Sequence, residues 1–195
     1  MEKNIYIMRW YGPFADMESA RNWDRTNHVP CSLYLMSGMK KYAKSSVHYY
    51  IGKAERNLIT DRFKDKNHHI NDFSRIKEIW LGSFANKKAS HGDVMLVENM
   101  LTSYFVGEVG KDKMLNKINF CLPTSNVYVL SEWINPYSEL AWQKLSRNSP
   151  ANIVADVIVN KANDNAFNYY LYVSKKLKKQ ERKEQYERRI TTETP

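Results

Sequence analysis

Two short β-rich runs near the start of the chain constrain the fold more than any other feature of the sequence. They cover residues 31–36 (CSLYLM) and 47–52 (VHYYIG). Between them lie Ser37, Gly38 and a lysine-rich stretch that ends at Ser46. Two such runs around a polar loop that contains glycine predict a β-hairpin. The loop, residues 37–46, is long for a hairpin.

The segments that follow alternate between helical and extended patterns. After Gly52, apolar residues at 58, 59 and 63 fall on one side of a helix, with Asn57 as a candidate N-cap. A longer helix is predicted over 91–105, where Asp93 suits the N-terminus and the apolar stripe includes Val94 and Leu101. Strands are predicted over 4–10, 76–84 and 127–130, and a short helix over 16–26.

The C-terminal third gives a less regular pattern. Asn135 followed by Pro136 indicates a helix that begins there, and Ser149 followed by Pro150 indicates another over 151–161. Residues 167–173 are aromatic and β-branched, which fits either a strand or the start of a helix in the tail.

These elements together predict an α/β (α+β) protein with a small, largely antiparallel three-stranded sheet flanked by helices. We divide the 195 residues into an N-terminal elaboration (1–30), a core (31–121), an elaboration of helices and strands (122–174) and a basic tail (175–195). A chain of this length can bury a sizeable core without disulfides or structural metals.

The charge balance suggests a polyanionic partner. The net charge is +9 and the pI about 9.4, which favours nucleic acid and, less often, an anionic membrane surface. Residues 175–189 hold eight Lys or Arg against three Glu, hence +5. The tail either tracks phosphates or is a solvated charged helix.

Composition also excludes several classes of protein. Two cysteines, Cys31 and Cys121, cannot form a disulfide framework or a four-thiolate zinc site. No apolar run approaches the 18 or so residues of a membrane span, and the first residues lack the pattern of a secretion signal. We therefore expect a cytoplasmic protein that does not enter a membrane.

Two charged residues lie where the helical patterns call for apolar ones. Arg62 borders the stripe that contains Phe63, and Glu98 lies within the stripe of the longer helix. A charge on a buried face is costly unless it is paired. Either the two side chains pair with each other in the core, or they line a cleft where Arg62 meets phosphate and Glu98 meets a divalent cation.

The order of these residues resembles the GIY-YIG nuclease superfamily. The resemblance rests on SLY (residues 32–34), YIGKA (50–54), NL (57–58), Arg62, LVENML (96–101) and LNK (115–117). The string from Tyr50 to Phe63 is especially similar to the nuclease module of the bacterial nucleotide-excision-repair incision subunit, and restriction-type enzymes share the motifs. The match covers about residues 31–121, with spacings of 16, 12, 36 and 18 between Tyr34, Tyr50, Arg62, Glu98 and Asn116.

The resemblance implies a metal-dependent endonuclease that hydrolyses phosphodiester bonds in DNA, with RNA left open as a substrate. It implies Mg²⁺, for which Mn²⁺ can substitute, held by the single carboxylate of Glu98. Tyr34 would be the general base and Tyr50 would orient water or phosphate. Arg62 would fork onto the phosphate oxygens, and Lys53 would help to lower the pKa of Tyr34.

The closing motif and the segment after Arg62 complete the implied site. Asn116 would fix either the helix that carries Glu98 or a loop carbonyl. Some members of the family have His or Tyr four residues after the Arg, but here that position is Lys66, with His68 and His69 just beyond. Of these three we rank His68 first.

The resemblance leaves the biological pathway open among restriction, repair, mobile-element and phage-defence enzymes. A second hypothesis is a catalytically inactive nucleic-acid-binding module that retains the fold. This second hypothesis would be favoured by a structure in which any one of four side chains is turned away from a common cleft: Tyr34, Tyr50, Arg62 or Glu98.

Overall fold

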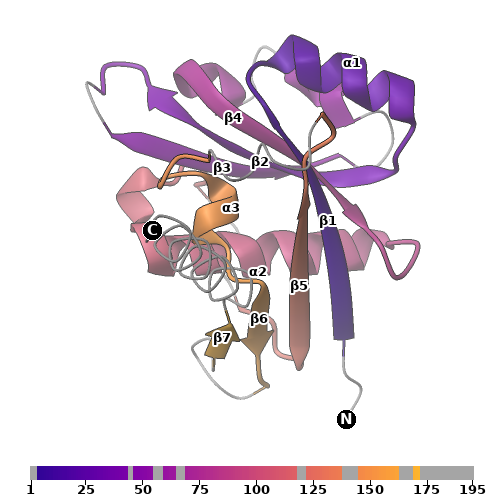
Figure 1. The fold of residues 1–195 in the computed structure, drawn as a ribbon. Helices are drawn as coiled ribbons and strands as arrows, with labels where there is room; N and C mark the ends of the chain where they lie inside the picture. Colours follow the sequence, from indigo (N-terminus) through magenta and orange to yellow (C-terminus); the bar gives the residue numbers. More distant parts are fainter. Residues whose placement is uncertain are drawn as a thin grey trace, which may run out of the picture.

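A seven-stranded mixed β-sheet forms the centre of the computed structural model, in the order β3-β2-β4-β1-β5-β6-β7 (Figure 1). The structure describes residues 4–43, 46–54, 59–64, 69–117, 122–137, 145–162 and 169–171. The strands are β1 (Asn4–Phe14), β2 (Cys31–Lys40), β3 (Val47–Lys53), β4 (Phe73–Phe84), β5 (Val127–Ile134), β6 (Val157–Asn160) and β7 (Tyr169–Leu171).

The helices lie on the two faces of this sheet (Figure 1). They are α1 (Met17–Asn27), α2 (His91–Val109) and the short α3 (Pro150–Ile153). Three 3₁₀ segments follow strands or α2: η1 (Ile59–Lys64), η2 (His69–Asp72) and η3 (Lys111–Lys113).

The predicted three-stranded sheet is wrong. Strand β1 lies between β4 and β5, antiparallel to the first and parallel to the second, so the sheet is mixed and continues well beyond the hairpin. Strands β1 and β5 come from outside residues 31–121. A strand pattern shows that a segment is extended, but it does not show which partner the strand will have.

Apart from the helix expected after Gly52, the local predictions in the first two thirds are confirmed. The hairpin of β2 and β3 forms in antiparallel register, with Tyr34 opposite Gly52 and Met36 opposite Tyr50. Helix α2 begins with a capping box between Ser90 and Asp93, which is the role that the sequence suggested for Asp93.

Two helix predictions are wrong, and two further predictions concern residues outside the described part of the chain. The expected helix over 151–161 is only α3, after which 157–160 (VIVN) pairs with β5 as a strand. The helix expected around residue 60 is the 3₁₀ segment η1, whose proposed cap Asn57 lies outside the described residues. Most of the helix predicted after Pro136, and the tail 175–195, also lie outside them. Of the alternatives for 167–173, the structure contains the strand β7.

The sheet has a hydrophobic core on each face. Helix α2 packs on one core, which contains Trp10, Leu35 and Tyr49. Helix α1, η1 and η2 cover the other, which contains Tyr34 and Phe63. Because side chains alternate along β3, Tyr49 faces the first core and Tyr50 borders the second.

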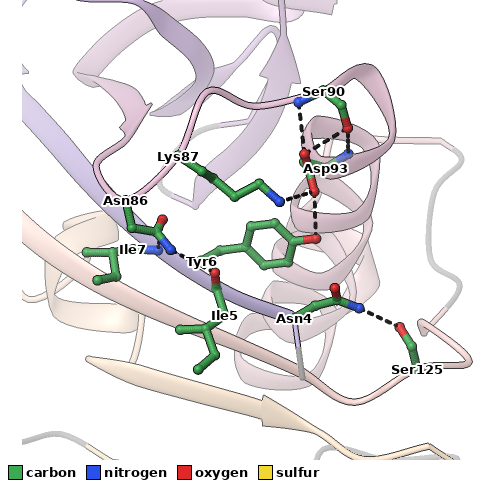
Figure 2. Close-up of polar contacts among 9 residues, drawn as sticks. All are labelled: Asn4, Ile5, Tyr6, Ile7, Asn86, Lys87, Ser90, Asp93 and Ser125. Carbon is green, nitrogen blue, oxygen red and sulfur yellow. Dashed lines mark hydrogen bonds and ion pairs between the residues drawn. The ribbon is translucent and has the colours of Figure 1, made fainter. Parts of the chain in front are cut away.

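A polar network fastens the N-terminus of α2 to β1 (Figure 2). The hydroxyl of Tyr6 donates to Asp93 at 2.8 Å, and Lys87 Nζ lies 2.7 Å from the same carboxylate oxygen. The Asn86 side chain accepts from the backbone N–H of Ile7 and donates to the carbonyl of Ile5. These contacts set the position of α2, and therefore of Glu98, against the sheet.

Candidate active site

The hairpin places two tyrosines side by side on the face covered by η1 and η2. The rings of Tyr34 and Tyr50 lie 5.9 Å apart at 45°, and their hydroxyls share a hydrogen bond. Tyr34 is 0% exposed, whereas Tyr50 is partly exposed. Of the two hydroxyl-bearing rings, Tyr50 is therefore the one nearer to solvent.

Gly52 makes room for the inner tyrosine. A Cβ at this position would lie 2.2 Å from both Cζ and the hydroxyl oxygen of Tyr34. The Tyr34 ring also packs edge-to-face on Phe63, with centroids 5.2 Å apart. The ring is thus held between the bare backbone of β3 and η1, which explains why the YIG motif ends in glycine.

Arg62 lies in η1, next to the Phe63 that packs on Tyr34. Its side chain is exposed, and its positive charge lowers the pKa of both Tyr34 and Tyr50. The guanidinium is therefore close enough to act on both phenols while it remains open to a ligand from solvent.

Glu98 is the buried carboxylate of this region. It is 5% exposed, and its Oε2 atom lies 3.5 Å from Nζ of Lys53 at the end of β3. Its negative charge raises the pKa of Tyr34 and of Tyr50. A dry core pair with Arg62, the structural alternative, is not favoured, because Arg62 is exposed and Glu98 has an ammonium partner in Lys53.

The side-chain amide of Asn116 makes the pair of hydrogen bonds to β3 that the backbone of a neighbouring strand would make. Its Oδ1 accepts from the N–H of Ile51 at 3.0 Å, and its Nδ2 donates to the carbonyl of Ile51 at 2.7 Å. Leu115 adds a backbone hydrogen bond to the carbonyl of Tyr49. Asn116 therefore holds the strand residue that lies between Tyr50 and Gly52.

The segment after Arg62 places one histidine beside the tyrosines. The ring of His69 lies 5.9 Å from that of Tyr50, and its Nδ1 is 3.3 Å from Asp72. His68, which we ranked first, and Lys66 lie outside the described residues.

Burial is the largest influence on the pKa of both tyrosines. Burial, the charge of Tyr50 and the shared hydrogen bond strongly raise the pKa of Tyr34. Burial also raises the pKa of Tyr50, but the hydrogen bond from Tyr34 and the charge of Arg62 lower it. The shared hydrogen bond raises the pKa of Tyr34 and lowers that of Tyr50, so it supports ionisation of Tyr50 rather than of Tyr34.

The donor set fits one hard divalent cation bound through few protein ligands. Glu98 supplies one buried carboxylate, whose Oε2 lies 3.5 Å from the Lys53 ammonium. Among the described residues, no group of three or more His, Cys, Asp or Glu could hold a metal. Mg²⁺ keeps several waters and is held in many sites by one or two carboxylates, so Glu98 is the described residue that could hold such an ion.

Comparisons with protein-family models, with curated proteins and with solved structures found no match to this chain. Within the described part of the chain, no helix is long and apolar enough to cross a membrane.

Two residues contribute to the site although the sequence analysis assigns them no role in it. Gly52 was visible as the last letter of the YIG motif, and its role follows from the register that places it opposite Tyr34. Phe63 belongs to the apolar stripe of a predicted helix. Only the packing of η1 on the hairpin brings it against Tyr34.

Proposed function

We propose that this protein is a metal-dependent endonuclease of the GIY-YIG type, acting on nucleic-acid phosphodiester bonds. One observation carries the proposal. Tyr34, Tyr50, Arg62 and Glu98 come from four separate elements. Even so, the two tyrosine rings lie 5.9 Å apart, and the Phe63 next to Arg62 packs on Tyr34. Glu98 pairs with Lys53 at the end of the strand that carries Tyr50. The proposal depends on the hairpin, η1 and α2, and not on the size of the sheet.

The chain's own residues can share the work of hydrolysis. Arg62 is exposed, and its planar fork suits the non-bridging oxygens of a phosphodiester. Tyr50 is the partly exposed phenol, so it is placed to accept the proton of the attacking water. Tyr34 donates a hydrogen bond to Tyr50 and thereby stabilises its phenolate. This order exchanges the roles that the family resemblance implies for the two tyrosines.

Glu98 would hold the divalent cation, with Lys53 as its neighbour. When bound, Mg²⁺ supplies positive charge that lowers the pKa of nearby acids and stabilises the leaving oxygen. Lys53 balances the buried carboxylate when no cation is present. Asn116 keeps β3, and with it Tyr50 and Lys53, in place.

The decisive experiment is an assay of the full chain with supercoiled, linear and single-stranded DNA and with RNA, in Mg²⁺ or in EDTA. We expect cleavage of at least one substrate in Mg²⁺ and none in EDTA. Glu98→Gln should abolish cleavage and retain binding. Glu108→Gln, an exposed glutamate of the same helix, is the matched control and should cleave normally.

Two results would contradict the proposal. Normal cleavage by Glu98→Gln would contradict the role of Glu98 as the residue that holds the metal. Binding of nucleic acid by the wild-type chain without cleavage of any substrate would instead support the inactive binding module.

A further inference from the structure

An exposed tyrosine occupies the turn of the β2–β3 hairpin. Tyr42 has φ 67°, in the left-handed region, and its side chain is fully exposed. A bulky residue at positive φ is strained, and this ring contributes no burial to the fold. The folded chain therefore does not account for tyrosine here, where Asn or Gly would fit the backbone better.

The turn is held firmly from its base. The N–H of Lys41 donates to the carbonyl of Asp72 at 3.0 Å, and that of Ala43 donates to the carbonyl of Lys40 at 3.1 Å. The hydroxyl of Ser74 donates to the carbonyl of Met39 at 3.2 Å. These hydrogen bonds hold the backbone on both sides of Tyr42 at the end of the β2–β3 hairpin.

The surroundings of the ring are basic. Lys40 and Lys41 precede it and are exposed, as is Arg75, which lies opposite Met39 on β4. Asp72 is the acidic neighbour, and its carboxylate contacts His69. An aromatic ring among cations is the combination that binds the bases and phosphates of a single strand.

The same short element connects the turn to the candidate active site. Segment η2 holds the turn through Asp72 at one end, and at the other it places His69 beside Tyr50. Along β3, Tyr50 is three residues from Val47, where pairing with β2 ends. At about 3.3 Å per residue the turn begins about 10 Å from Tyr50, a distance that one strand of nucleic acid can span.

We propose that Tyr42 stacks on an unpaired base of the nucleic-acid substrate, a few nucleotides from the bond that is cleaved, while Lys40, Lys41 and Arg75 contact the adjoining phosphates. This inference rests on the proposed function and narrows its substrate to strands with unpaired bases. A fully paired duplex offers no free base face at this position.

The test measures affinity for a single-stranded oligonucleotide of about 12 nucleotides, long enough to span both sites, and for the matching duplex. Full-length Glu98→Gln serves as the parent so that the probe stays intact. Adding Tyr42→Asn should weaken single-strand binding about 10-fold, whereas Tyr42→Phe, which keeps the ring, should leave it unchanged. Duplex binding should change little in either variant.

Two further measurements separate the outcomes. Tyr42→Asn relieves the backbone strain, so its melting temperature should equal or exceed that of the parent, which excludes misfolding as the cause. Quenching of 2-aminopurine in the oligonucleotide should persist with Tyr42→Phe and disappear with Tyr42→Asn. Tyr137→Asn, at an exposed tyrosine that contacts Phe14 at the end of β1, should behave like the parent.

Each contrary result has one meaning. Unchanged single-strand affinity in Tyr42→Asn would overturn the role of Tyr42 and leave the nuclease proposal standing. Equal losses on single strands and duplex would overturn base stacking. Absence of binding by the parent to any nucleic acid would overturn the proposed function and this inference with it.

Discussion

Tyr34 and Tyr50 differ in what surrounds their hydroxyls, and this difference decides their proposed roles. Tyr34 is fully buried, whereas Tyr50 is partly exposed. The hydrogen bond between them raises the pKa of Tyr34 and lowers that of Tyr50. A phenol that receives a hydrogen bond and lies near a guanidinium ionises more readily than one that donates. Neither property is visible in the sequence, where both residues are strand tyrosines.

The two tyrosines should respond differently to removal of the hydroxyl. In Tyr34→Phe the ring still packs on Phe63, but Tyr50 loses the hydrogen bond that lowers its pKa. The alkaline-rising limb of the kcat/KM profile should therefore move to higher pH by about one unit. Activity near neutral pH should fall about 10-fold and recover in part at higher pH. Tyr50→Phe should be inactive at every pH.

Kinetic profiles of both variants between pH 6 and pH 10 check this assignment. The expected shift corresponds to the loss of one hydrogen bond. If Tyr34→Phe were inactive throughout while Tyr50→Phe kept a shifted profile, Tyr34 would be the base.

Gly52 should tolerate no side chain. In Gly52→Ala the new methyl would meet the Tyr34 ring, and Phe63 leaves the ring little room to move away. We expect a loss of about 1–3 kcal/mol in the free energy of unfolding and a fall in cleavage of about 100-fold, because the phenol is displaced. Denaturant titration and the cleavage assay measure the two effects.

Gly107→Ala is the control for this substitution. Gly107 lies in α2, and a Cβ there would meet nothing within 4 Å. Alanine should therefore stabilise the helix by about 0.5–1 kcal/mol and leave cleavage unchanged. A Gly52→Ala protein with normal stability and normal activity would refute the close contact with Tyr34.

At the scale of elements, α2 depends on the network around Asp93. Burial raises the pKa of this carboxyl, but hydrogen bonds from Lys87 and Ser90 outweigh burial and hold the pKa well below its ordinary value. The carboxylate also accepts from Tyr6 of β1, so one side chain both caps the helix and fixes it to the sheet.

Replacing Asp93 should destabilise the protein in a pH-dependent way. Asp93→Asn weakens the cap and the contact with Lys87, so the free energy of unfolding at pH 7 should fall by about 1–2 kcal/mol. Since the folded pKa is depressed, the wild-type advantage is present above about pH 4 and is lost as the pH falls further. Urea titrations at pH 7 and at about pH 3 should show the difference between the two proteins shrinking. An equal difference at both pH values would mean that the charge of Asp93 contributes nothing.

At the scale of the whole molecule, β1 joins the two parts of the sheet. Met8 and Trp10 are 0% exposed, and β1 pairs with β4 on one side and β5 on the other. The candidate site lies on β2, β3, η1, η2 and α2, with Asn116 just beyond, but the core between α2 and the sheet includes residues of β1 and β5.

A fragment of residues 31–121 should therefore fail to fold, although it contains every candidate catalytic residue. Without β1, strand β4 exposes an unpaired edge and the core under α2 loses Tyr6, Met8 and Trp10. Thermal unfolding followed by near-UV circular dichroism should show no cooperative transition for the fragment and a cooperative one for the full chain. A cooperative transition in the fragment would show that β1 and β5 are dispensable for the site.

The sequence by itself determined the local elements and the candidate residues. Two β-rich runs around a polar loop identified the hairpin strands, and the polar start and apolar stripe of 91–105 identified α2. The order of tyrosine, arginine and glutamate suggested the chemistry. These properties depend on contacts between near neighbours, which the sequence records directly.

Only the tertiary structure decided how the elements combine. It placed β1 between β4 and β5, changed 157–160 from an expected helix into a strand, and paired Glu98 with Lys53 rather than leaving it to Arg62. It also buried Tyr34 more deeply than Tyr50 and set Gly52 beneath its ring. Strand partners, burial and hydroxyl donors arise from residues far apart in the chain, and a periodic pattern contains no information about such distant contacts.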